Sequence, residues 1–498
     1  MPKSTEPLTS GRLLGRNSMW SLIGMVAPML VALFAVPLLI EGFGKERFGL
    51  LSIIWMGIGY FSLFDMGFGR ALTKLVSERL GTGDTCDLNS LIWTALTLIF
   101  IFGVIGALIV VFGSEFILKN VLNVEQSLQK EGITAFRVLA IGLPVVVVTT
   151  AINGILQAYQ KFAIITAVRV PLGVVTFGGP LLMVQFSESL IWATLSLVIA
   201  RAIAFIGFFI TTAATCNELK HITLPQKRHI YPLFSFGGWL TVSNVVGPVM
   251  VYLDRFLLGS VMTMTAVAYY VTPFEVLRRI QIIPNSMLNV LFPAFTTALN
   301  TDKKRLVEIY SQSSRILILL ILPVLSATFL FAPEALNIWL GGDFREIATP
   351  VVQWLSIGWL INTVARMPFT VLQSAGRPDL TAKTHLSELV PYLIMLWLFT
   401  IQFGIAGTAA AWFIRVLFDA VVLNLLAWHK VPELKGAVFE NFLMVASLLM
   451  VFAVLWLIEP LFIRMIVTII ISIASAIILW PVIKKMAPGL TAKFQKSI

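Results

Sequence analysis

The fold class is decided by a run near the N-terminus, residues 18–40, which reads SMWSLIGMVAPMLVALFAVPLLI. The run holds 23 residues without a charged side chain, and an α-helix needs about 20 mostly apolar residues to cross the hydrocarbon core of a bilayer. Lys3, Arg12 and Arg16 precede it, as in a secretory signal peptide. However, it is too long for the apolar region of such a peptide and lacks a small-x-small cleavage site. We therefore expect a first membrane helix.

Similar runs follow along the whole chain, and they are continuous, which indicates helices rather than the alternating strands of a barrel. Hydrophobic residues make up 58% and charged residues 12% of the sequence, against about a quarter charged in soluble domains. This composition excludes a soluble enzyme, a disordered regulator and a disulfide scaffold. We expect an all-α polytopic membrane protein with about 14 transmembrane helices. The further runs lie at 48–69, 88–114, 136–158, 162–184, 189–215, 233–253, 267–293, 311–339, 349–372, 386–402, 404–428, 437–458 and 461–483.

The distribution of positive charge sets the orientation. With these spans, 21 Lys and Arg fall on the side of the N-terminus and six on the other side. Cytoplasmic segments carry the excess of Lys and Arg, so both termini are predicted to be cytoplasmic.

A weak internal repeat divides the chain. It has an offset of about 216–220 residues, and six-plus-six repeats are typical of transporters whose two bundles rock around a central site. We therefore expect two pseudosymmetric six-helix bundles and two additional C-terminal helices, with Pro28 and Pro248 as candidate hinges or static kinks. The matches are Trp20 and Pro28 with Trp239 and Pro248, and Leu156-Gln157-Ala158 with Leu372-Gln373-Ser374. The predicted domains are an N-terminal bundle at 1–216, a cytoplasmic linker at 217–232, a C-terminal bundle at 233–429, and helices 13 and 14 with a tail at 430–498.

Sequence signals for catalysis are missing. No phosphate-binding loop, dinucleotide fingerprint or His/Cys metal motif occurs, and the loops are too short to form a catalytic domain. The two cysteines, Cys86 and Cys216, are expected to be inert. The net charge of +11 is spread between apolar blocks, so it does not indicate nucleic-acid binding. We expect a protein that is not an enzyme and has no catalytic residue, cofactor or metal.

Nine arginines, and no lysine, fall inside the predicted spans. An Arg at a helix centre costs about 2.5–3.5 kcal/mol on the insertion scale and by default indicates function. Arg137, Arg315, Arg366 and Arg464 lie near helix ends, where they can snorkel to the interface. The remaining arginines are predicted to bind an anionic group such as a phosphate, which guanidinium holds bidentately. They are Arg169, Arg201, Arg278, Arg279 and Arg415.

Two acids offer an alternative explanation for part of this set. Glu275 lies four residues before Arg279 and Asp419 four residues after Arg415, so each pair shares a helix face. Ion pairs that hold the bundle together therefore compete with ligand binding as an interpretation. Arg201 and Arg278 have no obvious acid in the sequence, which favours an anionic ligand or a water-filled cavity.

Several stretches resemble the Wzx-type polysaccharide flippases of the multidrug/oligosaccharidyl-lipid/polysaccharide superfamily. They are Phe64-Asp65-Met-Gly67-Phe-Gly69, Gly154 to Phe162, Tyr252-Leu-Asp254-Arg255 to Gly259, Ala268-Tyr-Tyr270, and Ile283-Pro284 to Leu291-Phe-Pro293.

The resemblance implies two bundles that open alternately to each side of a bacterial inner membrane. It implies transfer of an undecaprenyl-diphosphate-linked oligosaccharide to the outer leaflet, for O-antigen, capsule or exopolysaccharide synthesis. The lipid-linked glycan, membrane lipid and other polysaccharide-assembly proteins would be the partners. It further implies ion coupling, with Glu275, Asp419 or Asp65 as carriers, and gives Asp254 and Arg255 a place in the family motif.

Three other functions stay open. A multidrug exporter of the same superfamily would need buried acids, and residues 18–40 contain none. A lipid II flippase would concentrate Arg in helices one, two and eight, whereas helix one has Arg only at its entrance. A membrane glycan polymerase or ligase would carry a large outer loop, whereas the outer loops predicted here are short.

Overall fold

The computed structural model describes residues 9–60, 65, 67–84, 87–121, 126–219, 222–262 and 264–486. These residues form helices and short connections, with no β-strand among them, which confirms the all-α fold class. Eleven of the described helices are long and apolar enough to cross a membrane. The number of 14 spans and the side on which the termini lie remain predictions.

The chain divides into two compact units, each with its own internal packing. We call Asn17–Thr241 the N-terminal unit, and Met1–Arg16 together with Val242–Ile498 the C-terminal unit. The chain passes from one unit to the other within α1 and again within α7. The first helices are α1 (Gly11–Tyr60), α2 (Phe68–Thr82), α3 (Leu88–Phe116), α4 (Gln126–Ala158), α5 (Phe162–Val184) and α6 (Leu190–Thr215). They are followed by α7 (Lys227–Val261), α8 (Met264–Arg279), α9 (Ile282–Thr301), α10 (Lys303–Leu330), α11 (Ala332–Leu340), α12 (Gly342–Ser374), α13 (Pro378–Lys430), α14 (Lys435–Trp456) and α15 (Leu461–Met486).

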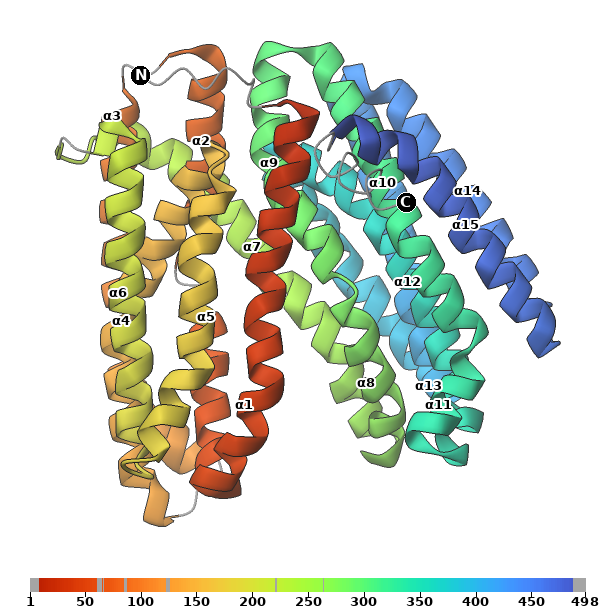
Figure 1. The fold of residues 1–498 in the computed structure, drawn as a ribbon, viewed down its shortest axis with the longest axis horizontal. Helices are drawn as coiled ribbons and strands as arrows, with labels where there is room; N and C mark the ends of the chain where they lie inside the picture. Colours follow the sequence, from red (N-terminus) through yellow and green to blue (C-terminus); the bar gives the residue numbers. More distant parts are fainter. Residues whose placement is uncertain are drawn as a thin grey trace, which may run out of the picture. The chain divides into compact units, whose positions relative to one another are not determined.

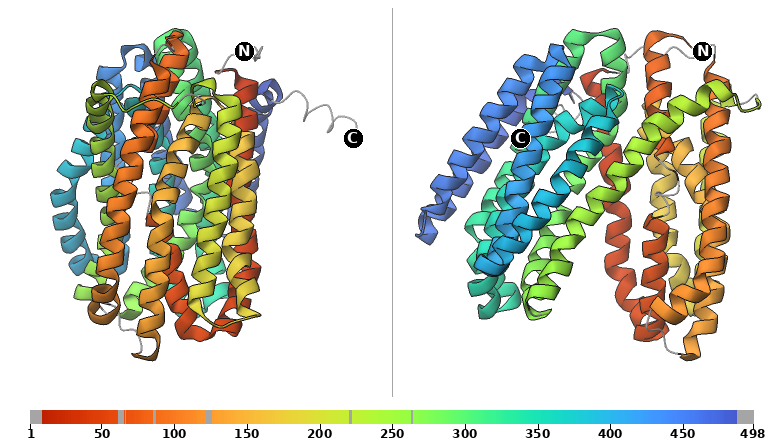
Figure 2. Two further views of the ribbon diagram at one scale, coloured as in Figure 1. Left: turned by 90° about the vertical axis from the view of Figure 1, so that its left-hand side faces the viewer. Right: turned by 180° about the vertical axis from the view of Figure 1, so that it is seen from behind.

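In the N-terminal unit α4 packs against α2, α3 and α6, and α5 packs against α6. Figures 1 and 2 show α3, α4, α5 and α6 side by side over most of their length. Gly67 precedes α2 in a left-handed conformation, with φ of 71°. A Cβ atom there would lie 2.5 Å from the carbonyl oxygen of Gly237, so only glycine permits this close approach.

In the C-terminal unit α12 packs along α13, and α10 contacts α9, α12, α14 and α15. Its core is aromatic: the ring of Trp412 lies 4.8 Å from Trp359 and 5.8 Å from Phe274, centroid to centroid. Gly358 makes room for this packing, because a Cβ atom there would lie 2.3 Å from the Trp412 ring.

Three of the predicted spans differ from separate, unbroken helices: one is interrupted, and two follow each other without a loop. The run at 267–293 is not one helix, because α8 ends at Arg279 and α9 begins at Ile282. Pro284 cannot donate to the carbonyl of Ile280, and the amides of Ile280 and Gln281 instead bond three residues back. The runs at 386–402 and 404–428 form two helices that follow each other directly within α13, and the chain reverses between them at Gly404 (φ 61°, ψ −143°). We call residues 378–403 and 405–430 the two legs of α13.

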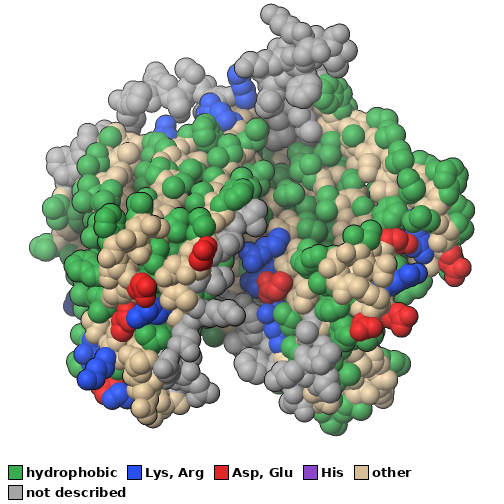
Figure 3. Space-filling model, turned by 60° about the horizontal axis from the view of Figure 1, so that its bottom comes forward, with side chains coloured by type: hydrophobic (Ala, Val, Ile, Leu, Met, Phe, Trp, Pro, Cys, Tyr) green, Lys and Arg blue, Asp and Glu red, His purple; other side chains and the backbone are tan. Residues whose placement is uncertain are grey.

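The outer surface of the helices is apolar. Figure 3 shows hydrophobic side chains over most of the face in view, with charged side chains in small groups. α15 exposes Phe462, Ile470 and Ile477, among others, while Ser475 and Leu479 are buried. Apolar surface of this extent needs lipid around it, which agrees with a multi-pass membrane protein.

Candidate functional site

A first group of charged side chains joins α7 to α8. The guanidinium of Arg255 lies 2.5 Å from Glu275, and Arg278 lies 3.6 Å from the same carboxylate oxygen, Oε1. Arg255 also lies over the ring of Phe274, 5.3 Å from its centroid. Within α8, Glu275 thus pairs with Arg278 at position i+3. The sequence had suggested a pair with Arg279, at position i+4. Arg278 and Arg279 are both exposed within the described chain.

Asp254 holds the same two helices together from within. It is fully buried, and the hydroxyl of Tyr270 donates to its Oδ2 over 2.6 Å. The amide of Arg255 donates to its Oδ1 over 2.7 Å. Asp254 and Arg255 therefore fix α8 against α7, and a gating role for them stays a prediction.

The two legs of α13 enclose a second group. Arg415 lies 3.9 Å from Glu388 of the other leg, and His385 lies 3.8 Å from Asp419. The guanidinium of Arg415 also contacts the sulfur of Met250 at 3.6 Å and lies 5.5 Å from the ring centroid of Tyr392. Arg415 is thus a buried member of a polar cluster, and its ion pair is formed across the legs instead of with Asp419.

Glu388 and His385 are functional candidates that the sequence reasoning missed. The signal was present, because Glu388 is an acid inside the apolar run 386–402, three residues after a histidine. Their partners lie about 30 residues further along the chain, and only the reversal at Gly404 brings the two legs into contact.

Two arginines of the N-terminal unit lie inside spanning helices without an acid beside them. Arg169 of α5 lies next to α1, where a Cβ atom on Gly24 would be 3.4 Å from its Cδ. Arg201 of α6 donates to the carbonyl of Leu197 over 3.1 Å. Among the described residues neither guanidinium forms an ion pair. Both remain candidates for binding an anion.

Asp65 has a local structural task. Its Oδ1 accepts from the amide of Gly67 over 2.7 Å, and its Oδ2 from the hydroxyl of Thr150 over 3.3 Å. It therefore shapes the turn before α2 and ties that turn to α4.

Pro28 packs where Gly173 of α5 has no side chain, since a Cβ atom there would lie 2.3 Å from the proline ring. Pro248 lies within α7, and its side chain is outside the described part.

The arginines expected near helix ends mostly have polar partners. Arg315 pairs with Glu440 at 2.9 Å. Arg464 pairs with Glu334 at 3.2 Å and also donates to the carbonyl of Ile458. Arg366 donates to the side chains of Asn285 and Asn362. Arg137 is exposed on α4.

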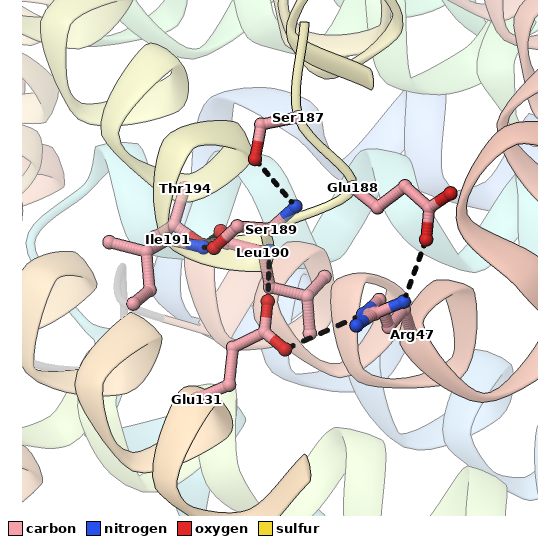
Figure 4. A network of polar contacts seen from close by, with 8 residues as sticks. All are labelled: Arg47, Glu131, Ser187, Glu188, Ser189, Leu190, Ile191 and Thr194. Carbon is pink, nitrogen blue, oxygen red and sulfur yellow. Dashed lines mark hydrogen bonds and ion pairs between the residues drawn. The ribbon is translucent and has the colours of Figure 1, made fainter. Parts of the chain in front are cut away.

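A separate network closes one end of the N-terminal unit (Figure 4). Arg47 of α1 lies 3.4 Å from Glu131 of α4 and 3.1 Å from Glu188 before α6. The other oxygen of Glu131 accepts from the amide of Leu190 over 2.6 Å, which satisfies a free amide at the start of α6. This network joins three elements and has a structural role.

Cys216 is a free, buried thiol. Burial, together with the nearby Glu218, raises its pKa to about 12, so it stays protonated and a poor nucleophile. Cys86 and His221 lie outside the described residues. Within those residues, no group of three or more His, Cys, Asp or Glu side chains is arranged to hold a metal ion.

Comparisons with known proteins agree with this picture. The sequence profile of a family described as polysaccharide biosynthesis protein matches residues 43–349. The chain is 30% identical to a putative O-antigen transporter of Shigella flexneri, over 82% of this chain and 97% of the relative. It is 23% identical to Agl15 of Haloferax volcanii, a probable low-salt glycan biosynthesis flippase, over 47% of this chain and 48% of the relative.

Solved structures share the fold. A MATE transporter in complex with MaL6 superimposes with a TM-score of 0.76 at 16% identity, covering 88% of this chain and all of that one. A MOP superfamily transporter from Pyrococcus furiosus, described as having a binding pocket of reverse polarity, gives 0.75 at 16% identity over 87% of this chain and 99% of that one. The chain thus has the fold of these transporters, and by sequence it belongs to the family described as polysaccharide biosynthesis protein.

Proposed function

We propose that this protein is a flippase that moves a lipid-linked oligosaccharide repeat unit across the bacterial inner membrane, for synthesis of a cell-surface polysaccharide such as O-antigen. The similarity to an O-antigen transporter over 97% of that relative is the observation that carries the proposal. Its relatives are named as a transporter and a flippase, which supports a protein that moves its substrate without reacting with it.

We assign the binding of the charged end of the substrate to the arginines inside the predicted spans. A polyprenyl diphosphate, such as undecaprenyl diphosphate, combines an anionic group with an apolar chain that stays in lipid. Arg169 and Arg201 offer guanidinium groups without an acid, and Arg278 and Arg279 offer exposed ones. Charge-assisted bonds from guanidinium to phosphate are about twice as strong as neutral ones and are often bidentate.

Transport by alternating access is the expected mechanism. The two units would open in turn to the cytoplasm, where both termini are predicted to lie, and to the outer side. Pro28 and Pro248 are the proposed hinges, and Asp254 with Arg255 keeps α7 and α8 moving as one piece. Inside each unit the pairs described above, such as Arg255 with Glu275, would stay formed.

The first test uses a deletion strain. Lipid-linked glycans are labelled with a membrane-impermeant glycan reagent on intact spheroplasts, and the fraction on each leaflet is measured. We expect completed repeat units to accumulate on the cytoplasmic leaflet and the surface polysaccharide to be lost. Normal surface glycan with altered drug sensitivity would instead favour a multidrug exporter, the function for which the MATE-like fold is the supporting observation.

A further inference from the structure

The helices α9 and α12 are the most deeply packed of the eleven candidate spans in the described chain. Residues 284–298 of α9 and 355–374 of α12 are described throughout, and in these two stretches only five side chains are not buried. They are Asn285, Asn289, Asn362, Arg366 and Phe369. We call these five residues the amide strip, because three of the five are asparagines.

Three side-chain hydrogen bonds between the start of α9 and the end of α12 fix how the strip is assembled. They join Gln281 to Thr363 at 3.4 Å, Asn285 to Arg366, and the carbonyl of Phe292 to Ser374 at 3.0 Å. The partners lie 82, 81 and 82 residues apart in the sequence, so the two helices run side by side in the same direction. The same offset places Asn289 level with residues 370–371, next to Phe369. The strip is therefore one continuous patch within the C-terminal unit.

The chemistry of the strip differs from that of the outer surface of the protein. The exposed side chains of α15, such as Phe462 and Ile470, are apolar, as expected for a surface that faces lipid. A polar group that faces hydrocarbon without a partner is costly. Polar side chains inside spans therefore usually face the interior of the bundle or a water-filled cavity. A partly open strip of amides on two deeply packed helices is thus expected to face water or a ligand.

The hydrogen-bonding capacity of the strip lies in its amide NH2 groups. Arg366 donates from Nε to Oδ1 of Asn362 over 3.3 Å, and from a terminal nitrogen to Oδ1 of Asn285. Both asparagines thus direct their oxygens to the guanidinium. Among the described residues, their NH2 groups and the side chain of Asn289 form no hydrogen bond. Each NH2 group carries two donors, so the strip offers several uncharged donors to a ligand.

Phe369 adds an apolar surface beside these donors. The imidazole of His385 stacks on its ring, with 5.7 Å between the centroids and an angle of 16° between the planes. The Phe369 side chain nevertheless stays partly exposed. Ligand sites commonly combine aromatic side chains with a few polar groups that fix the orientation. A sugar ring suits this combination, because its hydroxyl groups accept from amides and its C–H groups pack against an aromatic ring.

We propose that the amide strip binds a sugar ring of the oligosaccharide, with Asn289 and Asn362 donating to hydroxyl groups and Phe369 packing against the ring. This inference rests on the proposed function and adds to it a contact for the glycan, apart from the arginines assigned to the charged end. A phosphate fits the strip less well. It is held best by charged donors, whereas the NH2 groups of the strip are neutral and Arg366 already donates to two amide oxygens.

Binding of two lipids to the purified full-length protein in detergent tests the site. One is the lipid-linked glycan that accumulates in the deletion strain, and the other is undecaprenyl diphosphate without sugar; native mass spectrometry measures the bound fraction of each. Asn289→Ala removes neutral hydrogen bonds, so it should weaken binding of the glycolipid by about three- to tenfold and leave binding of undecaprenyl diphosphate unchanged. Asn337→Ala, at an exposed asparagine of α11, should change neither.

Asn362→Asp separates glycan binding from a purely structural role. Aspartate keeps an oxygen for Arg366 but loses both NH2 donors. We therefore expect Tm to be kept or raised, while the affinity for the glycolipid falls relative to that for undecaprenyl diphosphate. An unchanged ratio of the two affinities in this variant would mean that the strip only holds Arg366, and would overturn the proposal.

The ratio of the two affinities also separates this site from the proposed function. If Asn289→Ala affects both lipids equally, or neither, the sugar site is refuted and the flippase function stands. A wild type that binds neither lipid, in a strain whose glycans stay correctly placed without the protein, would refute the flippase function and the sugar site with it. Arg201→Gln, at an arginine assigned to the charged end, should weaken binding of both lipids alike.

Discussion

Arg201 is a matched contrast to Arg137, because both are arginines in apolar helices but only Arg137 is exposed. A hydrogen bond to a charged group contributes about 1.5–3 kcal/mol, and 1.4 kcal/mol is a factor of ten. We therefore expect Arg201→Gln to reduce flipping by about tenfold or more, and Arg137→Gln to leave it within about twofold. The measurement is the labelled outer-leaflet fraction at equal protein in the membrane. Equal loss in both variants would contradict binding of the cargo at Arg201.

Substitutions of Asp65 distinguish a role as a proton carrier from a structural role in the turn before α2. Its two oxygens accept hydrogen bonds from Gly67 and Thr150. Asparagine keeps one oxygen for the amide of Gly67, and its NH2 group can donate to the hydroxyl of Thr150. We expect Asp65→Asn to keep flipping and its pH dependence, and Asp65→Ala to lower the free energy of unfolding by about 1–2 kcal/mol. Thermal unfolding in detergent and flipping across pH would measure both. Loss of pH dependence in Asp65→Asn would restore Asp65 as an ion carrier.

The two legs of α13 are joined at one glycine with a non-helical backbone, as the two parts of α1 are at Gly44 (φ 76°, ψ 163°). Gly404 has φ of 61° and ψ of −143°, a region that residues with a Cβ atom rarely adopt. A Cβ atom there would meet only Met262, at 3.7 Å, so the strain is in the backbone. We expect Gly404→Ala to destabilise by about 1–3 kcal/mol, seen as a lower Tm. Gly436→Ala in α14 has open space around it and should leave Tm unchanged or slightly raised.

The sequence predicted helices well and side-chain partners poorly. Apolar runs predicted that the chain is helical, and two of the predicted runs, 386–402 and 404–428, were already divided next to Gly404. The helix spacing was correct for a bond from Glu275 along α8, but the side-chain geometry selected Arg278 instead of Arg279. Arg415 was assigned to Asp419 on its own leg, since contacts across a reversal such as that with Glu388 need the tertiary structure. Pro284 in the sequence could have predicted the break between α8 and α9. The break was missed because hydropathy averaged over a window of residues does not register a single proline.

For the whole chain, orientation is the property to test. Cysteines placed in a variant with Cys86 and Cys216 replaced by Ser report the side of each loop. Gly342 and Lys304 are both exposed, at opposite ends of the α10–α12 region. With cytoplasmic termini, Gly342→Cys should react with an impermeant maleimide in intact spheroplasts, and Lys304→Cys only after permeabilisation. The reverse pattern would invert the topology and the direction of flipping.

The reversal at Gly404 also has a consequence for biosynthesis. Each leg of α13 has 26 residues, counted as 378–403 and 405–430, and at about 1.5 Å per residue each is long enough to cross the bilayer. The hydroxyls of Thr400 and Thr408 lie 2.9 Å apart across the turn, and no loop separates the legs. During synthesis no polar loop between the two legs has to be moved across the bilayer. The two legs can therefore insert into the lipid together, as a helical hairpin. Arg415 and Glu388 would then enter the hydrocarbon region as an ion pair, so neither charged side chain would have to be inserted alone.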